Sequence, residues 1–317
     1  MENTPSLNNS ELRPSTELTH GRLIEMFIAD TQNLKETSKN RYRKSLNRYF
    51  EWVSGSGFTL DKITLTELLV YKQFLFERKT KDGTMLSKFT VNAYLNAVKV
   101  FYEWANSKGL LFNPAKALKA PKRDSKFERE PLSVDQSKAL LEYFKNTSVR
   151  DFAICNLMLR CGLRTIEVVR LDVEDITMKA GTRIIMVQGK GKDTKDRFVV
   201  LNDKAYQPII EYLNGRTSGP IFLSESTNRT NERLIQETIS RIIKKGLRAI
   251  GLNSKKFTAH SLRHTAGTTA MRNGATLSQV QEFLRHASDQ TTKGYTATLK
   301  DEQRLKNSAE NLLDDAF

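Results

Sequence analysis

Cysteine and long apolar runs are both scarce in this chain of 317 residues. The two cysteines, Cys155 and Cys161, lie six residues apart in a segment expected to be helical, so they point to different faces and cannot form a disulfide. We interpret both as reduced core residues. No segment approaches the roughly 20 apolar residues of a membrane span, and the amino terminus, MENTPSLNNSELRPSTE, has no apolar signal core. These absences predict a cytoplasmic protein without a membrane partner.

Acidic residues are too few to balance the basic ones, with 36 Asp and Glu against 51 Lys and Arg and a net charge of +15. The excess is even: residues 1–130 carry 22 basic and 15 acidic residues, and residues 131–317 carry 29 and 21. A neutral enzyme with a basic tail would instead carry its excess positive charge in one part of the chain. The distribution therefore favours a long polyanion held by both halves, with an affinity that falls as salt rises. Composition alone does not decide between a protein that binds nucleic acid and a basic protein with another function.

The amino-terminal part predicts a small helical domain. Residues 1–18 are polar and aperiodic, which is typical of a flexible lead, whereas residues 19–112 carry apolar positions at helical spacing. The basic residues Lys39, Arg43 and Lys44 surround the apolar face of one such segment and are candidate DNA-binding residues. The expected helices cover about 23–28, 37–53, 66–79 and 90–107.

A charged segment separates this domain from the rest of the chain. Residues 113–130 contain Pro121 and lack sustained periodicity, so we expect an interdomain linker. Its Lys122 and Arg123 are further candidate DNA-binding residues, although a solvated tether explains them equally well.

Residues 131–300 predict a second domain that is mostly helical. Ser133 can cap its first helix through the side-chain hydroxyl. Two runs rich in β-branched residues, at 182–187 and 197–201, flank a turn-rich stretch and indicate a β-hairpin. Further helices are expected at about 149–160, 165–169, 203–213, 231–249, 261–272 and 277–285. The fold class is therefore mainly α with a small antiparallel sheet, in two domains.

Three of the four histidines, His260, His264 and His286, fall close together. Two of them lie four residues apart on a predicted helix, a spacing that can hold zinc. However, Arg263 lies between them, no carboxylate follows His260 as in the HExxH pattern, and no cysteine is near. We therefore expect no metal site and no cofactor, and an ordinary core role is an alternative for His264.

Two further segments carry residues suited to phosphate chemistry. Lys190 lies in the Gly-rich turn QGKGKDTK, which lacks the spacing of a P-loop but can place a lysine where it hands a proton to a leaving oxygen. Arg164 and Glu167 lie in GLRTIE, where the arginine can grip phosphate and the glutamate can orient it. Taken alone, a solvated turn and an exposed salt bridge are the simpler interpretations.

Order and spacing change that balance. The residues singled out above occur in one order along the chain, and Tyr295 follows His286 after nine residues. This ordered set resembles the tyrosine recombinase family, which includes phage integrases and the Xer- and Cre-type enzymes, and the resemblance extends over nearly the whole chain. Two positions depart from the family pattern: Arg285 stands where a glycine is common, and Val200 stands where a proline often follows the hairpin. We expect these to affect loop shape rather than activity. The residues that carry the resemblance are Arg164, Lys190, His260, Arg263, His286 and Tyr295, nine residues after His286.

The resemblance implies a metal-independent enzyme that breaks and rejoins DNA. Tyr295 would be the nucleophile, because a phosphate ester of tyrosine conserves the bond energy for religation. Arg164 and Arg263 would stabilise the charge that builds on the phosphate, in the role that metal ions have in other phosphoryl-transfer enzymes. Lys190 would be the general acid for the leaving 5′ oxygen.

The remaining site residues would assist this reaction. His260 would accept the tyrosine proton or orient the phosphate, His286 would donate a hydrogen bond, and Glu167 would position its neighbours. The domain at residues 19–112 would be the family's core-binding, SAM-like module, and with residues 131–300 it would form a two-domain DNA clamp.

The expected function is site-specific recombination in the nucleoid, through a 3′-phosphotyrosyl intermediate and a Holliday junction. The partners would be double-stranded DNA with paired sites, a homo-tetramer or a hetero-tetramer with a related recombinase, and an accessory DNA-bending protein. Residues 301–317 would form a helix that packs in cis or contacts a neighbouring protomer. A type IB topoisomerase and a catalytically silent DNA-binding regulator are the alternatives. Integration, excision and dimer resolution all fit the sequence.

Overall fold

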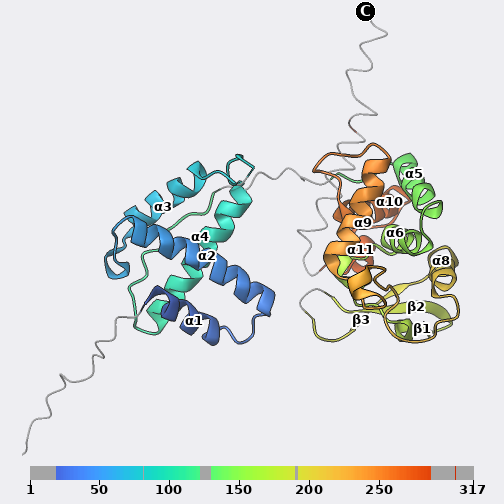
Figure 1. Ribbon diagram of the computed structural model, residues 1–317, viewed down its shortest axis with the longest axis horizontal. Coiled ribbons are helices and arrows are strands. Elements are labelled where there is room, and N and C mark those ends of the chain that lie inside the picture. Colours follow the sequence, from blue (N-terminus) through green and yellow to red (C-terminus); the bar gives the residue numbers. More distant parts are fainter. Residues whose placement is uncertain (1–18, 81, 122–129, 190–191, 287–303, 305–317) are drawn as a thin grey trace, which may run out of the picture. The chain divides into compact units, whose positions relative to one another are not determined.

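The structure, a computed structural model, describes residues 19–80, 82–121, 130–189, 192–286 and 304 (Figure 1). The described residues group into two compact units, one within residues 1–125 and one within residues 126–317. The domain bounds given above stay a prediction. The predicted lead lies outside the described residues, and so does the predicted carboxy-terminal helix apart from Arg304. Four of the candidate site residues also lie outside them: Lys122, Arg123, Lys190 and Tyr295.

The amino-terminal unit is built from helices packed around an aromatic core. The four predicted helices are confirmed, and a short 3₁₀ helix, η1 (Leu60–Lys62), precedes the third. Tyr49 and Tyr102 are fully buried and share a hydrogen bond of 2.8 Å between their hydroxyls. Their rings pack edge to face, an arrangement that adds to the burial of apolar surface. The helices are α1 (His20–Asp30), α2 (Glu36–Gly55), α3 (Leu65–Glu77) and α4 (Lys88–Ser107).

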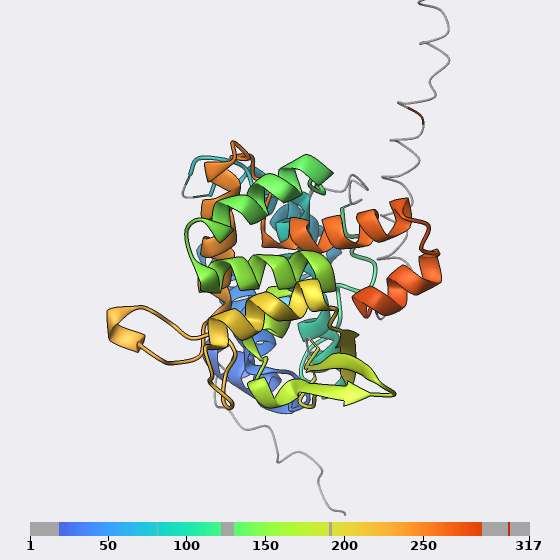
Figure 2. The same ribbon diagram turned by 90° about the vertical axis from the view of Figure 1, so that its right-hand side faces the viewer.

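The carboxy-terminal unit is also mainly helical, and α6 (Val149–Cys161) runs through its core. It packs against α5, α8 and α10, and Figure 2 shows it between α5 and α8. Cys155 and Cys161 are buried and free on this helix, as expected. Burial raises the pKa of the Cys161 thiol to about 12. The other helices are α5 (Val134–Lys145), α7 (Thr165–Val169), α8 (Asp203–Leu213), α9 (Gln236–Ala249), α10 (Ala259–Arg272) and α11 (Leu277–Leu284), with 3₁₀ helices η2 (Val173–Asp175) and η3 (Thr227–Arg229).

A three-stranded antiparallel sheet lies at one end of this unit. Strand β2 (Thr182–Val187) pairs with β3 (Arg197–Val200), as the hairpin pattern predicts, and with β1 (Ile176–Lys179), which the sequence did not predict. Strand β1 has only four residues, and the turn that joins it to β2 has Ala180 where glycine or asparagine is usual. Ala180 and Gly181 both have positive φ, at 47° and 77°.

Local sequence signals set most of the other boundaries. The Ser133 hydroxyl accepts a hydrogen bond from the backbone N–H of Gln136, and the Gln136 side chain accepts one from the N–H of Ser133, which completes the predicted cap. The helix predicted over 231–249 begins later, at Gln236, because Arg233 is in a bridge to Leu223. No helix within the described residues is long and apolar enough to cross a membrane.

Gly162 ends α6 at the point where that helix meets α11. Its φ of +57° is left-handed, which favours glycine. A Cβ at this position would lie 2.6 Å from Cδ2 of Leu284 and 3.2 Å from Cζ of Phe283. The absence of a side chain therefore permits both the turn and the close packing of α11.

We expect Gly162→Ala to lower the free energy of unfolding of the carboxy-terminal unit by about 2–4 kcal/mol, because left-handed strain and overpacking add. Gly215→Ala is the matched control, since Gly215 also has positive φ but a Cβ there would have no atom within 4 Å. It should cost only about 1 kcal/mol.

The chain holds a separate probe for each unit. Both tryptophans, Trp52 and Trp104, lie in the amino-terminal unit, and both cysteines lie in the carboxy-terminal unit. Pulsed thiol labelling against urea therefore follows one unit while tryptophan fluorescence follows the other. Equal losses for Gly162→Ala and Gly215→Ala in the thiol transition would contradict the role of close packing at Gly162.

Candidate active site

Arg164 and Glu167 are held together at the start of α7. The backbone N–H of Arg164 donates to Oε2 of Glu167 at 2.8 Å, and its guanidinium donates to Oε1 at 2.7 Å. The Glu167 side chain is completely buried, whereas that of Arg164 is 24% exposed. Arg164 therefore lies between a buried carboxylate and solvent. The exposed salt bridge considered from the sequence is wrong, because the carboxylate of this pair is buried.

Arg263 reaches the same carboxylate from α10. Its side chain is only 1% exposed, and Nη1 lies 3.7 Å from Oε2 of Glu167. Nη1 also donates to the carbonyl of Gly162 at 2.5 Å, and Nη2 donates to the carbonyl of Leu284. Arg263 therefore joins the ends of α6 and α11, which lie more than a hundred residues apart in the chain.

Arg285 makes a contact that the sequence did not predict. It ends α11 with a positive φ of 54°, which explains why glycine is common at this position in the related family. Its side chain does more than change the shape of the loop, because Nη2 lies 3.0 Å from Oε2 of Glu167 and the side chain is only 5% exposed. The place of Arg285 next to the candidate site residue His286 was the sequence signal that could have indicated a role for it in the site.

The three arginines around one carboxylate form what we call the Glu167 cluster: Arg164, Arg263, Arg285 and Glu167. Burial alone would raise the pKa of Glu167, but Arg285, the Arg164 N–H and the other guanidiniums hold it below its ordinary value. The carboxylate is therefore ionised. Three guanidiniums against one carboxylate leave a net positive charge, which suits the cluster to bind a phosphodiester.

His286 follows Arg285 and is largely buried. Burial, together with Arg263, Arg164, Arg285 and His260, lowers its pKa to about 4. The imidazole is thus neutral near pH 7, so it can donate a hydrogen bond from one ring nitrogen. His260 lies in the first turn of α10 and is exposed.

His264, the third histidine of the group, belongs to the core. It is 1% exposed, and its Nδ1 shares a hydrogen bond of 3.1 Å with the Thr268 hydroxyl. Within the part of the chain that the structure describes, no three His, Cys, Asp or Glu side chains converge in a way that could hold a metal ion.

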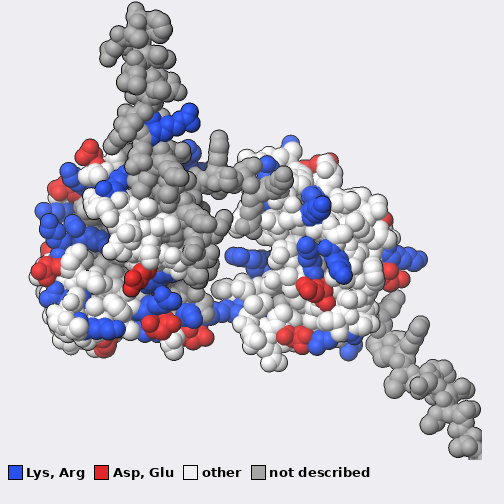
Figure 3. Space-filling model, turned by 180° about the vertical axis from the view of Figure 1, so that it is seen from behind, with Lys and Arg blue, Asp and Glu red and all other residues white. Residues whose placement is uncertain are grey.

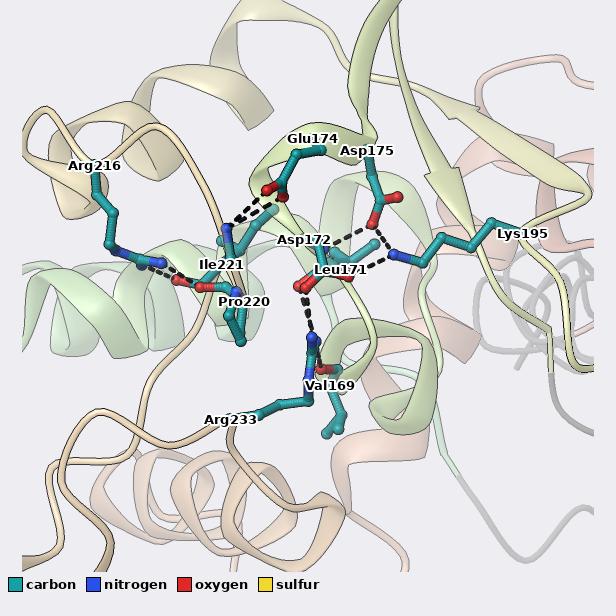
Figure 4. Close-up of polar contacts among 11 residues, drawn as sticks. Val169, Leu171, Asp172, Glu174, Asp175, Lys195, Arg216, Pro220, Ile221 and Arg233 are labelled. Atoms are coloured by element: carbon teal, nitrogen blue, oxygen red, sulfur yellow. Dashed lines mark hydrogen bonds and ion pairs between the residues drawn. The ribbon is translucent and has the colours of Figure 1, made fainter.

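The hairpin that carries Lys190 is anchored by a lysine that the sequence did not single out. Lys195 donates to Asp172 at 2.7 Å and to Asp175 at 2.5 Å, and Arg233 donates to the other carboxylate oxygen of Asp172 (Figure 4). Partial burial alone would lower the pKa of Lys195, but the two carboxylates outweigh this effect and raise that pKa above its ordinary value. The other side of the hairpin is held by Arg170, which donates to the carbonyl of Gly189 at 3.1 Å.

The candidate DNA-binding residues on α2 differ in their contacts. Arg43 forms ion pairs with Glu25 at 3.0 Å and with Glu36 at 2.9 Å, so its charge is already partly balanced. Lys44 is exposed and Lys39 is half-exposed. Figure 3 shows further Lys and Arg side chains on the visible face of each unit.

A groove between α2 and α4 adds residues that the charge pattern did not indicate. It has a volume of about 300 Å³, and its lining includes Arg41, Asn92, Asn96 and the 66% exposed Phe89. Arginine and asparagine are the side chains that pair with the major-groove edges of guanine and adenine. The polar residues at helical spacing on the fourth predicted helix were the sequence signal that could have indicated this groove.

Comparisons with known proteins agree over both units. The model of the phage integrase family matches residues 130–302, which is more than half of the chain, and that of the phage integrase N-terminal SAM-like domain matches residues 24–109. The chain is 30% identical over 286 residues to tyrosine recombinase XerC of Pelobacter propionicus, covering 87% of this chain and 89% of that protein. It is 31% identical over 246 residues to tyrosine recombinase XerA of Pyrococcus furiosus, covering 76% and 81%.

Solved structures show the same fold. A crystal structure of XerH site-specific recombinase bound to palindromic difH substrate matches with a TM-score of 0.72 and 21% identity, covering 92% of this chain and 85% of that one. The Tn1549 transposon integrase in complex with transposon right end DNA matches with a TM-score of 0.69 and 19% identity, covering 92% and 100%. With both domains matched, the chain belongs to the phage integrase family and is a site-specific tyrosine recombinase, an enzyme that breaks and rejoins DNA.

Proposed function

We propose that the enzyme cleaves duplex DNA at paired sites through a covalent 3′-phosphotyrosyl link to Tyr295 and exchanges strands through a Holliday junction. The observation that carries the proposal is the convergence of Arg164 and Arg263 on the buried Glu167, from α7 and α10. A diester phosphate carries one negative charge in the ground state and gathers more on its nonbridging oxygens during cleavage. The net positive charge of the Glu167 cluster stabilises that added negative charge.

The proton transfers follow from the remaining residues. The Tyr295 oxygen attacks phosphorus as its proton passes to His260, and the bond from phosphorus to the 5′ oxygen breaks as Lys190 protonates that oxygen. His286, neutral near pH 7, donates a hydrogen bond to a nonbridging oxygen. The reverse step, attack by a 5′ hydroxyl of the exchanged strand, releases Tyr295 and restores each proton.

We further propose that both units contact duplex DNA as a clamp in the nucleoid. Lys39, Lys44, Lys122 and Arg123 would contact phosphates, and the groove between α2 and α4 would face base edges. Paired sites require four copies, in a homo-tetramer or with a related recombinase. Integration, excision and dimer resolution then differ only in how the two sites are arranged on DNA, and an accessory DNA-bending protein would set that arrangement.

The test is covalent trapping on a nicked suicide duplex. Its recognition site is first selected from randomised duplexes by binding, and the nick lets the 5′-hydroxyl fragment diffuse away so that religation is blocked. The wild-type enzyme should form a protein–DNA adduct that resists denaturation, and Tyr295→Phe should bind equally but form none.

Other outcomes of this experiment separate the alternatives. An adduct with Tyr295→Phe would mean that another residue is the nucleophile. Relaxation of a plasmid that lacks the site would indicate a topoisomerase, and binding without any cleavage would indicate a silent regulator.

The anchoring of the hairpin generates a second prediction. Lys195→Met removes the contacts with Asp172 and Asp175, so Lys190 should be less well placed, and the cleavage rate should fall about 10-fold or more. Lys204→Met is the control, because it removes the same charge from an exposed residue of the same unit. It should leave the rate nearly unchanged.

A sulfur-substituted duplex tests the cause of that loss. When sulfur replaces the 5′ bridging oxygen, the thiolate leaves without a proton, so Lys195→Met should cleave this duplex nearly as fast as the wild type does. An equal loss on both duplexes would show that Lys195 does not act through proton delivery.

A further inference from the structure

Arg285 occupies a backbone conformation that its residue type does not favour. Its φ of 54° and ψ of 45° are left-handed, and a residue with a Cβ adopts this region only at a cost that glycine avoids. Two other helices of this unit, α6 and α8, end in the same conformation on Gly162 and Asn214, which are the usual residues there. The cost at Arg285 must be offset by contacts of its side chain.

The side chain folds back into the catalytic unit. Nη1 donates to the carbonyl of Phe283 at 2.7 Å, and Nη2 donates to Oε2 of Glu167 at 3.0 Å and to the carbonyl of Gly162 at 3.3 Å. Its Nε is buried and has no hydrogen-bond partner among the described residues. The guanidinium therefore gives up part of its hydrogen bonding in order to reach Glu167.

Arg285 and Arg263 contact the same two groups. The Gly162 carbonyl accepts from both, whereas Oε2 of Glu167 accepts from Arg285 at 3.0 Å and forms only an ion pair with Arg263 at 3.7 Å. Without Arg285, Oε2 would lose its nearer guanidinium. Arg263 would then be drawn closer to the carboxylate, since a buried charge without close partners is costly.

We propose that Arg285 is a positioning residue for DNA cleavage, which balances Glu167 so that Arg164 and Arg263 can act on the scissile phosphate. The proposal rests on the recombinase reaction described above. Arg285 acts through Glu167 and does not itself contact DNA. Its substitution should therefore change the cleavage step rather than the affinity for DNA.

The charge of Arg285 also acts on its neighbour His286. The charged and titratable groups that lower the pKa of His286 are Arg263, Arg164, Arg285 and His260. Removing Arg285 takes away one positive charge, so protonation of His286 should begin at higher pH. The midpoint of the His286 titration, followed by NMR of its imidazole, should then move upward in pH.

The experiment compares Arg285→Gly, Arg285→Gln and Arg285→Lys in single-turnover cleavage of the suicide duplex. Glycine relieves the backbone strain, glutamine keeps most of the bulk, and lysine keeps the charge. The Gly and Gln variants should cleave about 10- to 100-fold more slowly, by analogy with groups that orient the residues bound directly to a reacting centre. The His286 titration of both variants should move up in pH, whereas lysine should restore that titration and part of the rate.

Three controls complete the design. Affinity for the uncleaved duplex should change less than about 3-fold, because a bulk charge effect of one residue is small at moderate salt. Arg229→Gln removes an exposed arginine of the same unit, which forms an ion pair with Glu232, and should leave the rate unchanged. The urea transition by thiol labelling shows whether each variant is folded.

The outcomes distinguish this inference from the proposed function. If Tyr295 forms the adduct but the Gly and Gln variants cleave at the wild-type rate with unmoved His286 titrations, the positioning role is wrong and the recombinase reaction stands. A loss of stability with an unmoved His286 titration would reduce Arg285 to a structural ion pair. Failure of wild-type trapping would overturn the proposed function itself.

Discussion

The site depends on one buried carboxylate. Glu167 is completely buried and lies among three guanidiniums that come from α7, from α10 and from the end of α11. Without it, three positive charges would face one another in a largely buried site, which is unfavourable before any DNA binds. With it, the charge is reduced but stays positive. Such a site is stable when empty and still attracts a phosphate.

The fold around this carboxylate brings distant segments together. Gly162 lets α6 end close to Leu284 of α11, and its carbonyl accepts from Arg263 and Arg285, two of the arginines that contact Glu167. Arg263 then links that carbonyl to the end of α11. Backbone geometry and charge therefore reinforce each other. A change in how α6 meets α11 would move the arginines as well as the core.

Much of this could be predicted from the sequence, because hydrophobic periodicity and capping residues act locally. The helices, the hairpin and the grouping of Arg164 with Arg263 follow from such signals and from motif order. Strand β1 was missed because its four residues carry no clear alternation. Arg285 and Lys195 were missed for another reason: the direction of their side chains depends on α7 and η2, which adjoin them only in the folded unit.

The unfolding free energy of Glu167→Gln tests the central role of this carboxylate most directly. Glutamine keeps the size of the side chain but leaves three guanidiniums without their counter-charge. We expect a loss of about 3–5 kcal/mol in the thiol-labelling transition of the carboxy-terminal unit, with no change in the tryptophan transition of the other unit. A loss below about 1 kcal/mol, within the range of an ordinary surface ion pair, would contradict that role.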